Sequence, residues 1–182
     1  MNAPASGLSE TLLALRQEFD RSFAQAPRLE TEPPENFLAV RVGGDAYALR
    51  VAEIGGLFTD RRIMPLPTPM PALLGVAGFR GQIAPVYDLA ALLGYARQTA
   101  PRWLIMARRR EPVALAFDVF DAHFSAFSAS IIATEGRDAA RLHLGSAVRI
   151  GDATRPIIQL QSLLDDIQLR ANSFTRTRSG QA

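Results

Sequence analysis

Residues 75–89 constrain the fold more than any other part of this 182-residue chain, because their pattern is typical of a β-hairpin that runs into a helix. Two runs of apolar and β-forming residues flank Arg80 and Gly81, and glycine can take the positive φ that a tight reversal needs. Asp88 is expected to cap a short helix directly after the hairpin, with Gly94 at the helix stop. Many short strand patterns with turn signals between them predict a mainly β architecture of barrel type.

The hairpin also carries a distinctive string of residues, Gly-Val-x-x-Phe-Arg-Gly-x-Ile-x-Pro-Val-x-Asp-Leu. This string resembles the signature of the CheW-like domain, the adaptor domain of bacterial chemosensory arrays, and the resemblance extends from about residue 37 to about residue 167. It implies two SH3-like β-barrel subdomains joined through a shared waist. It also implies a non-catalytic adaptor that couples chemoreceptors to a CheA-type histidine kinase, without distinguishing swimming chemotaxis from pilus-driven twitching.

Two partner surfaces follow from the resemblance. In the family, one barrel face docks on the regulatory domain of the kinase, and a groove near the waist takes the signalling tip of a chemoreceptor. Ungapped matching places Ile54 and Leu57 in this groove, with Arg80 at its edge and Phe79 beside it in the Phe-Arg-Gly turn. The alternative is that Ile54 and Leu57 belong to the domain's own core, because apolar residues beside a short helix are usually buried.

The chain departs from the family pattern at two glycines. Gly78 is found where an asparagine is usual, and Gly56 where the family has the acid that pairs with the arginine matched here by Arg80. A buried, unpaired guanidinium would be costly, so Arg80 needs another acceptor or water. Glu53 is the nearest candidate in the sequence.

The N-terminal part, residues 1–36, is predicted to be a helix followed by a linker. Apolar residues recur at helical spacing over residues 8–25, namely Leu8, Leu12, Leu15, Phe19 and Phe23. Three prolines between residues 26 and 36 rule out a continuation of the helix. The apolar face either docks on a partner or packs on the chain's own domain.

The predicted CheW-like domain covers residues 37–170. Residues 37–95 are expected to supply one barrel and residues 100–158 most of the other, so that the two meet near residues 95–100. Leucine and isoleucine at helical spacing from Leu160 to Ile167 predict a packed C-terminal helix. Residues 171–182 are polar and are expected to be a disordered tail.

Composition argues against catalysis, and we expect neither an enzyme nor a bound cofactor or metal. The chain has no cysteine and no lysine, which excludes thiolate and Schiff-base chemistry. The two histidines, His123 and His143, lie in no catalytic motif. Asp118 and Asp121 are close to His123 in the sequence, but their side chains alternate between faces if this segment is a strand.

The second function considered is a nucleic-acid-binding barrel of SH3 or OB type, in which aromatic residues beside basic ones stack on bases. Only Tyr95 and Trp103 are near arginines, Arg97 and Arg102 respectively, and the net charge is only +2. No apolar run reaches the roughly 20 residues that span a bilayer, and the N-terminus does not resemble a secretory signal. We therefore expect a cytoplasmic protein without membrane insertion that binds protein partners.

Overall fold

The computed structural model describes residues 32–96, 100–134 and 143–179, with side chains up to residue 171. The chain divides into two compact units, Met1–Pro33 and Pro34–Ala182. The predicted helix at residues 8–25 lies outside the described residues. All the helices and strands that the structure describes lie in the second unit.

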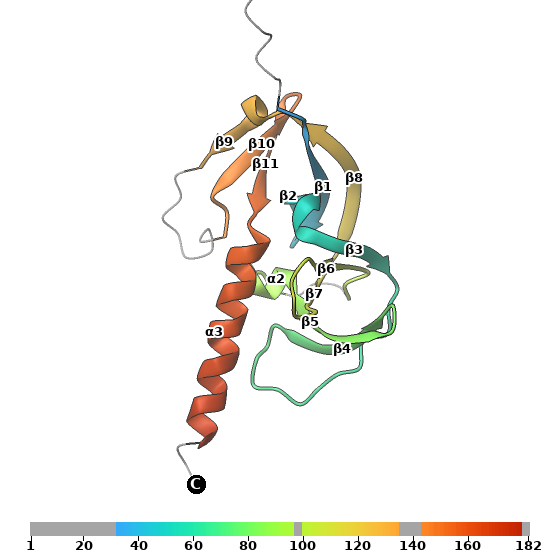
Figure 1. Cartoon of the computed structure of the whole chain (residues 1–182), viewed down its shortest axis with the longest axis vertical. Helices are drawn as coiled ribbons and strands as arrows, with labels where there is room; N and C mark the ends of the chain where they lie inside the picture. The colour runs from blue at the N-terminus through green and yellow to red at the C-terminus, as the bar shows by residue number, and fades with distance from the viewer. Residues whose placement is uncertain (1–31, 97–99, 135–142, 180–182) are drawn as a thin grey trace, which may run out of the picture. The chain divides into compact units, whose positions relative to one another are not determined.

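Two antiparallel-rich sheets make up most of this unit (Figure 1). The first has six strands in the order β8-β1-β2-β11-β10-β9, with β1 Glu35–Val42, β2 Asp45–Arg50, β8 Val119–Ala126, β9 Ile131–Ala133, β10 Ser146–Ile150 and β11 Ala153–Ile158. The second has five strands in the order β3-β6-β7-β5-β4, with β3 Ile54–Thr59, β4 Leu73–Phe79, β5 Gln82–Asp88, β6 Trp103–Ala107 and β7 Ala114–Phe117. The expected mainly β fold class is confirmed.

The allocation of strands to the two halves was wrong. Hairpin β1–β2 belongs to the same sheet as β8–β11, while β6 and β7 complete the sheet of β3–β5. The reason is the burial of β1, in which the four consecutive residues from Phe37 to Val40 are buried. Such a strand needs a neighbour on each edge and cover on both faces, and β8 supplies the second edge. The two sheets are therefore interleaved along the chain.

The hairpin at the centre of the sequence forms as predicted. Strand β4 pairs with β5, and the turn places Arg80 at φ 46° and Gly81 at φ 85°, the left-handed pair of a two-residue hairpin turn. The carboxylate of Asp88 accepts hydrogen bonds from the backbone N–H groups of Ala90 and Ala91. Helix α2, Leu89–Leu92, follows directly and is only four residues long.

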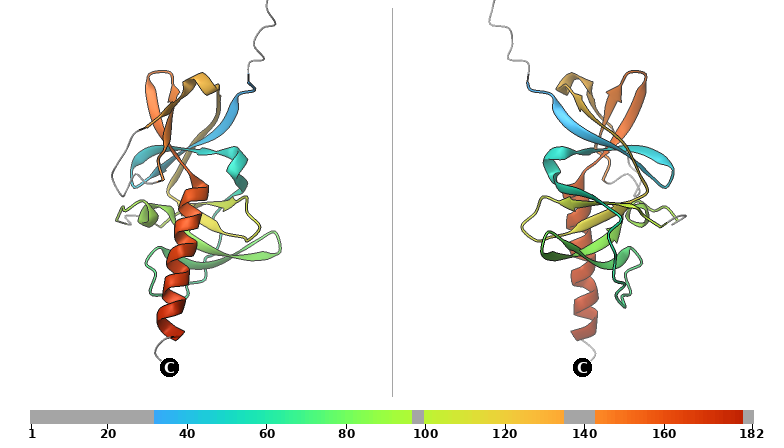
Figure 2. Two further views of the ribbon diagram at one scale, coloured as in Figure 1. Left: turned by 60° about the vertical axis from the view of Figure 1, so that its left-hand side comes forward. Right: turned by 90° about the vertical axis from the view of Figure 1, so that its right-hand side faces the viewer.

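Short 3-10 turns and a long helix complete the unit. The turns are η1 Val51–Glu53 and η2 Ser128–Ser130, and helix α3 covers Leu160–Ser179. Helix α3 runs beside the five-stranded sheet and beyond it (Figure 2). The prediction of a disordered tail from residue 171 was therefore wrong for residues 171–179. Helix α3, which starts at Leu160, continues through them to Ser179. No helix in the described parts of the chain is long and apolar enough to cross a membrane.

The largest core cluster joins both sheets to α3, and we call it the waist core. It includes Leu38, Val40 and Leu49 of the six-stranded sheet, Ile105, Leu115 and Phe117 of the five-stranded sheet, and Leu160, Leu163, Leu164 and Ile167 of α3. Burying about ten large apolar side chains is the dominant favourable term in folding. Because one core serves both sheets, neither sheet has a complete core without the other.

Candidate partner-binding surfaces

The four residues predicted to bind partners belong to two separate clusters. Ile54 is part of the waist core, and Leu57 packs against it. Phe79 belongs to a second cluster inside the five-stranded sheet, and Phe58 packs against that one. Successive strand residues point to opposite faces, so Leu57 and Phe58 of β3 are directed to different sides of the strand. The predicted residues therefore do not form one surface.

Burial decides which of them a partner can touch. Ile54 is only 6% exposed and Phe79 only 2%, so both are core residues in the free protein. For Ile54, this agrees with the alternative that the residue is part of its own domain. Leu57 is half-buried and Arg80 is exposed, which leaves these two accessible.

Arg80 does not contact Glu53, contrary to the expectation from sequence proximity. The Glu53 carboxylate instead accepts a hydrogen bond of 3.0 Å from the backbone N–H of Leu160, at the start of α3. The guanidinium carbon of Arg80 lies 5.6 Å from the ring centroid of Phe58, and that of Arg61 lies 5.3 Å from the same centroid. Both distances are in the range of cation–π contacts.

We call Phe58, Phe79, Arg61 and Arg80 the Phe58 cluster. The rings of Phe58 and Phe79 meet edge to face, with centroids 5.0 Å apart and an interplanar angle of 63°. This contact fixes the ring on which the two arginines rest. The sequence analysis did not single out Phe58 and Arg61. The signal that could have indicated a cation–π contact was a phenylalanine at the end of a predicted strand with an arginine three residues later.

Gly56 explains why the ring can occupy this position. A Cβ atom at residue 56 would lie 2.9 Å from Cε2 of Phe58, closer than real Cβ contacts allow. A side chain there would therefore displace the ring. At the position where the resemblance leads one to expect an acid, this chain has Gly56, which leaves room for the Phe58 ring.

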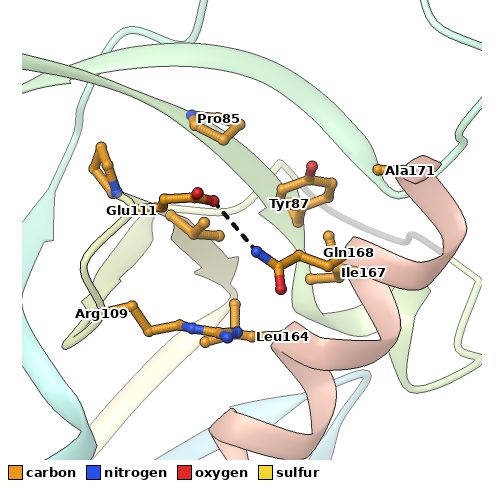
Figure 3. Close-up of a pocket in the computed structure, with 10 residues that line it drawn as sticks. Pro85, Tyr87, Arg109, Glu111, Leu164, Ile167, Gln168 and Ala171 are labelled. Atoms are coloured by element: carbon orange, nitrogen blue, oxygen red, sulfur yellow. Dashed lines mark hydrogen bonds between the residues drawn. The ribbon is translucent and has the colours of Figure 1, made fainter. Parts of the chain in front are cut away.

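A pocket of about 620 Å³ lies between α3, strand β5 and the β6–β7 connection (Figure 3). Its floor includes Pro85, Tyr87 and Ile167, and burial raises the pKa of the Tyr87 hydroxyl. At the rim Gln168 donates a hydrogen bond to Glu111 at 3.2 Å. A second rim residue, Arg109, pairs with Asp165 of α3 at 3.0 Å. These two rim contacts tie the β6–β7 connection to the helix.

The aromatic residues considered for base stacking make internal contacts. The Tyr95 hydroxyl donates a hydrogen bond to the Asp45 carboxylate and also hydrogen-bonds the Tyr47 hydroxyl. Burial, together with these contacts, raises the pKa of Tyr95. The ring of Trp103 packs on Phe120 at 5.2 Å. Because both rings are engaged, they offer little stacking surface to a nucleic acid.

The polar residues examined for catalysis also have structural partners. Asp121 pairs with Arg41 and with Arg155, while Asp118 accepts a hydrogen bond from the backbone N–H of Gly43. His143 is buried and bonds the Ser162 hydroxyl at 3.0 Å through Nδ1. Across the three described segments, no group of three or more histidine and acidic side chains is placed to hold a metal ion.

Comparison with known proteins agrees with this architecture. The sequence model of the CheW-like domain matches residues 36–168. No curated protein matches significantly. Among solved structures, the chain is similar to the scaffolding protein TtCheW from Thermoanaerobacter tengcongensis, with a TM-score of 0.63 and 18% identity over 69% of this chain and 89% of that one. The structural match concerns the fold, and the family match covers most of the chain: this protein belongs to the CheW-like domain family.

Proposed function

We propose that this protein is a non-catalytic adaptor that couples chemoreceptors to a CheA-type histidine kinase. The observation that carries the proposal is the CheW-like domain over residues 36–168, folded around the hairpin of β4 and β5. Members of this family act as scaffolds in chemosensory signalling. A scaffold needs surfaces that bind its protein partners, and it does not need a reactive site. A cytoplasmic location is part of the same proposal.

The five-stranded sheet offers the apolar surface for the kinase. Ile83 in β5 is 75% exposed, and Met64 in the proline-rich segment before β4 is 60% exposed. A backbone bridge joins Met64 to Val76 of β4, which places that segment along the sheet edge. Ile83 and Met64 thus expose apolar surface on this sheet and on the segment along its edge, and exposed apolar surface is typical of protein-binding sites.

The direct test is binding of the purified protein to the kinase regulatory domain and to a receptor signalling hairpin from the same organism. We expect a complex with each, and the identity of the receptor would distinguish a swimming system from a twitching one. Absence of both complexes would contradict the proposal. Tight, salt-sensitive binding to single-stranded DNA would instead favour the nucleic-acid-binding barrel.

Ile83→Asp tests the kinase surface. The side chain is exposed, so we expect the thermal midpoint to stay within about 2 °C, since surface substitutions usually cost under about 0.5 kcal/mol. Loss of a central apolar contact should weaken kinase binding by roughly tenfold or more. Val119→Asp is the matched control on the six-stranded sheet, where Val119 is 42% exposed. Equal weakening by both variants would show that Ile83 has no special role.

A further inference from the structure

The pocket between α3, β5 and the β6–β7 connection is not part of the proposed partner surfaces (Figure 3). Its volume of about 620 Å³ falls in the range of small-molecule sites, roughly 300–1,000 Å³. Six of its ten lining residues are apolar, namely Pro85, Pro112, Val113, Leu164, Ile167 and Ala171. Because these residues come from three different elements, the packing of the fold itself forms the hollow.

Tyr87 supplies a hydrogen-bonding group to this pocket. The residue is only 8% exposed, and its ring is part of the waist core. Its hydroxyl has no hydrogen-bond partner among the residues that the structure describes. Every fully buried side-chain nitrogen or oxygen in these residues does have a partner, so the Tyr87 hydroxyl is not sealed and opens into the pocket that Tyr87 lines. A buried tyrosine hydroxyl normally has a partner, and the pocket is where one can bind.

The charged residues at the rim already have partners within the chain. Arg109 pairs with Asp165 of α3 at 3.0 Å, and Glu111 accepts a hydrogen bond of 3.2 Å from Gln168. A charged ligand would compete with one of these contacts, and it would lose hydration against the apolar walls. An uncharged ligand avoids both costs.

We propose that this pocket binds a small uncharged molecule with a mainly apolar body and one hydrogen-bonding group, which pairs with the Tyr87 hydroxyl. The apolar body would cover side chains of α3 and of the β6–β7 connection, such as Ile167 and Val113. A phenolic hydroxyl can donate or accept, so an alcohol, a phenol or a carbonyl group suits it. This inference goes beyond the proposed function, which needs no small-molecule ligand.

Three probes of similar size separate these requirements in titrations of the purified full chain. 2-Naphthol has an apolar body and a hydroxyl, naphthalene lacks the hydroxyl, and 2-naphthoate carries a negative charge. We expect saturable binding of 2-naphthol, with shifts of the Val113 and Ile167 amide signals in NMR spectra. Naphthalene should bind about fivefold more weakly, because it leaves the Tyr87 hydroxyl unpaired. 2-Naphthoate should also bind more weakly than 2-naphthol, because its charge loses hydration in the pocket.

Tyr87→Phe removes the hydroxyl and keeps the ring. This variant should weaken 2-naphthol binding by about fivefold and leave naphthalene binding unchanged, a pattern that a general disturbance of the fold would not give. Ala171→Leu places a larger side chain at the pocket wall, so it should weaken the binding of both probes. Ala122→Leu, at an exposed alanine of β8, is the matched control and should change the binding of neither.

The inference is overturned if 2-naphthol at millimolar concentration shows no saturable binding, or if the shifted amide signals lie away from the pocket. It is also overturned if 2-naphthoate binds as tightly as 2-naphthol, or if Tyr87→Phe weakens the two uncharged probes equally or weakens neither. Binding of the kinase and the receptor is measured separately, so failure of the proposed function remains distinguishable from failure of this site.

Discussion

Single residues join the elements of this protein, and Glu53 is one that contacts two distant segments. Its carboxylate accepts a hydrogen bond from the backbone N–H of Leu160 at the start of α3. Its backbone carbonyl accepts one of 2.8 Å from the backbone N–H of Arg108. A negative charge at a helix N-terminus is favourable because the first N–H groups have no partner within the helix. Glu53 thus joins η1, the β6–β7 connection and α3.

Glu53→Ala should lower the free energy of unfolding by about 1–2 kcal/mol, because it leaves the N–H of Leu160 without its acceptor. Chemical denaturation of both proteins measures this difference. Glu53→Gln keeps an oxygen acceptor but removes the charge, and it should be intermediate. An alanine variant as stable as the wild type would show that water replaces the carboxylate at no cost.

His143 makes the stability of the fold depend on pH. Burial lowers the pKa of its imidazole; Arg170 acts in the same direction and Asp166 opposes it. The unfolded chain therefore binds a proton at a higher pH than the folded one. The free energy of unfolding should therefore decrease as the pH drops below about 6.5, the ordinary histidine pKa. The decrease should continue until the pH reaches the lowered pKa that His143 has in the folded protein. Denaturation across this range should show a smaller pH dependence for His143→Gln than for the wild type.

The β1–β2 turn contacts the segment that follows helix α2. Gly43 and Gly44 both have positive φ, at 61° and 91°, as a two-residue hairpin turn requires. The ring of Tyr95, which follows α2, packs against Gly43, and a Cβ atom there would lie 2.4 Å from the ring. The turn therefore provides both a chain reversal and a contact surface.

The two glycines of this turn allow a matched comparison. Gly43→Ala should destabilise the fold by more than Gly44→Ala, because both substitutions strain the backbone by about 1–2 kcal/mol but only the first also displaces the Tyr95 ring. At Gly44 a Cβ atom would meet nothing within 4 Å. Thermal unfolding of the two variants measures the difference, and equal midpoints would mean that the ring moves freely.

Across the whole molecule, local features were predictable and distant pairings were not. The β4–β5 hairpin and the cap at Asp88 follow from residues close together in the sequence, and both are confirmed. The pairing of β1 with β8 joins Phe37 to Phe124, and no local pattern in the sequence encodes it. The Phe58 cluster was missed for the same reason, since Arg80 and Phe58 meet only through the sheet.

Removal of the N-terminal unit tests how far the domain is self-contained. A chain that begins at Pro34 should remain folded and unfold in one cooperative step, because the compact second unit starts at that residue and keeps the strands of both described sheets and the waist core. Circular dichroism and a thermal scan would compare it with the full chain. Aggregation, or a midpoint lower by more than about 5 °C, would show that residues 1–33 cover part of the domain.

The interleaving of the two sheets sets an order on folding during synthesis. Hairpin β1–β2 leaves the ribosome early, but its sheet neighbours β8 and β11 lie at residues 119–126 and 153–158. The buried residues of β1 therefore lack part of their cover until nearly the whole domain has been made, although all strands of the five-stranded sheet have been synthesised by residue 117. A nascent chain halted after β7 contains the apolar β1–β2 hairpin but lacks β8 and β11, which flank it in the sheet. In this state the hairpin is exposed to aggregation or to binding by a chaperone.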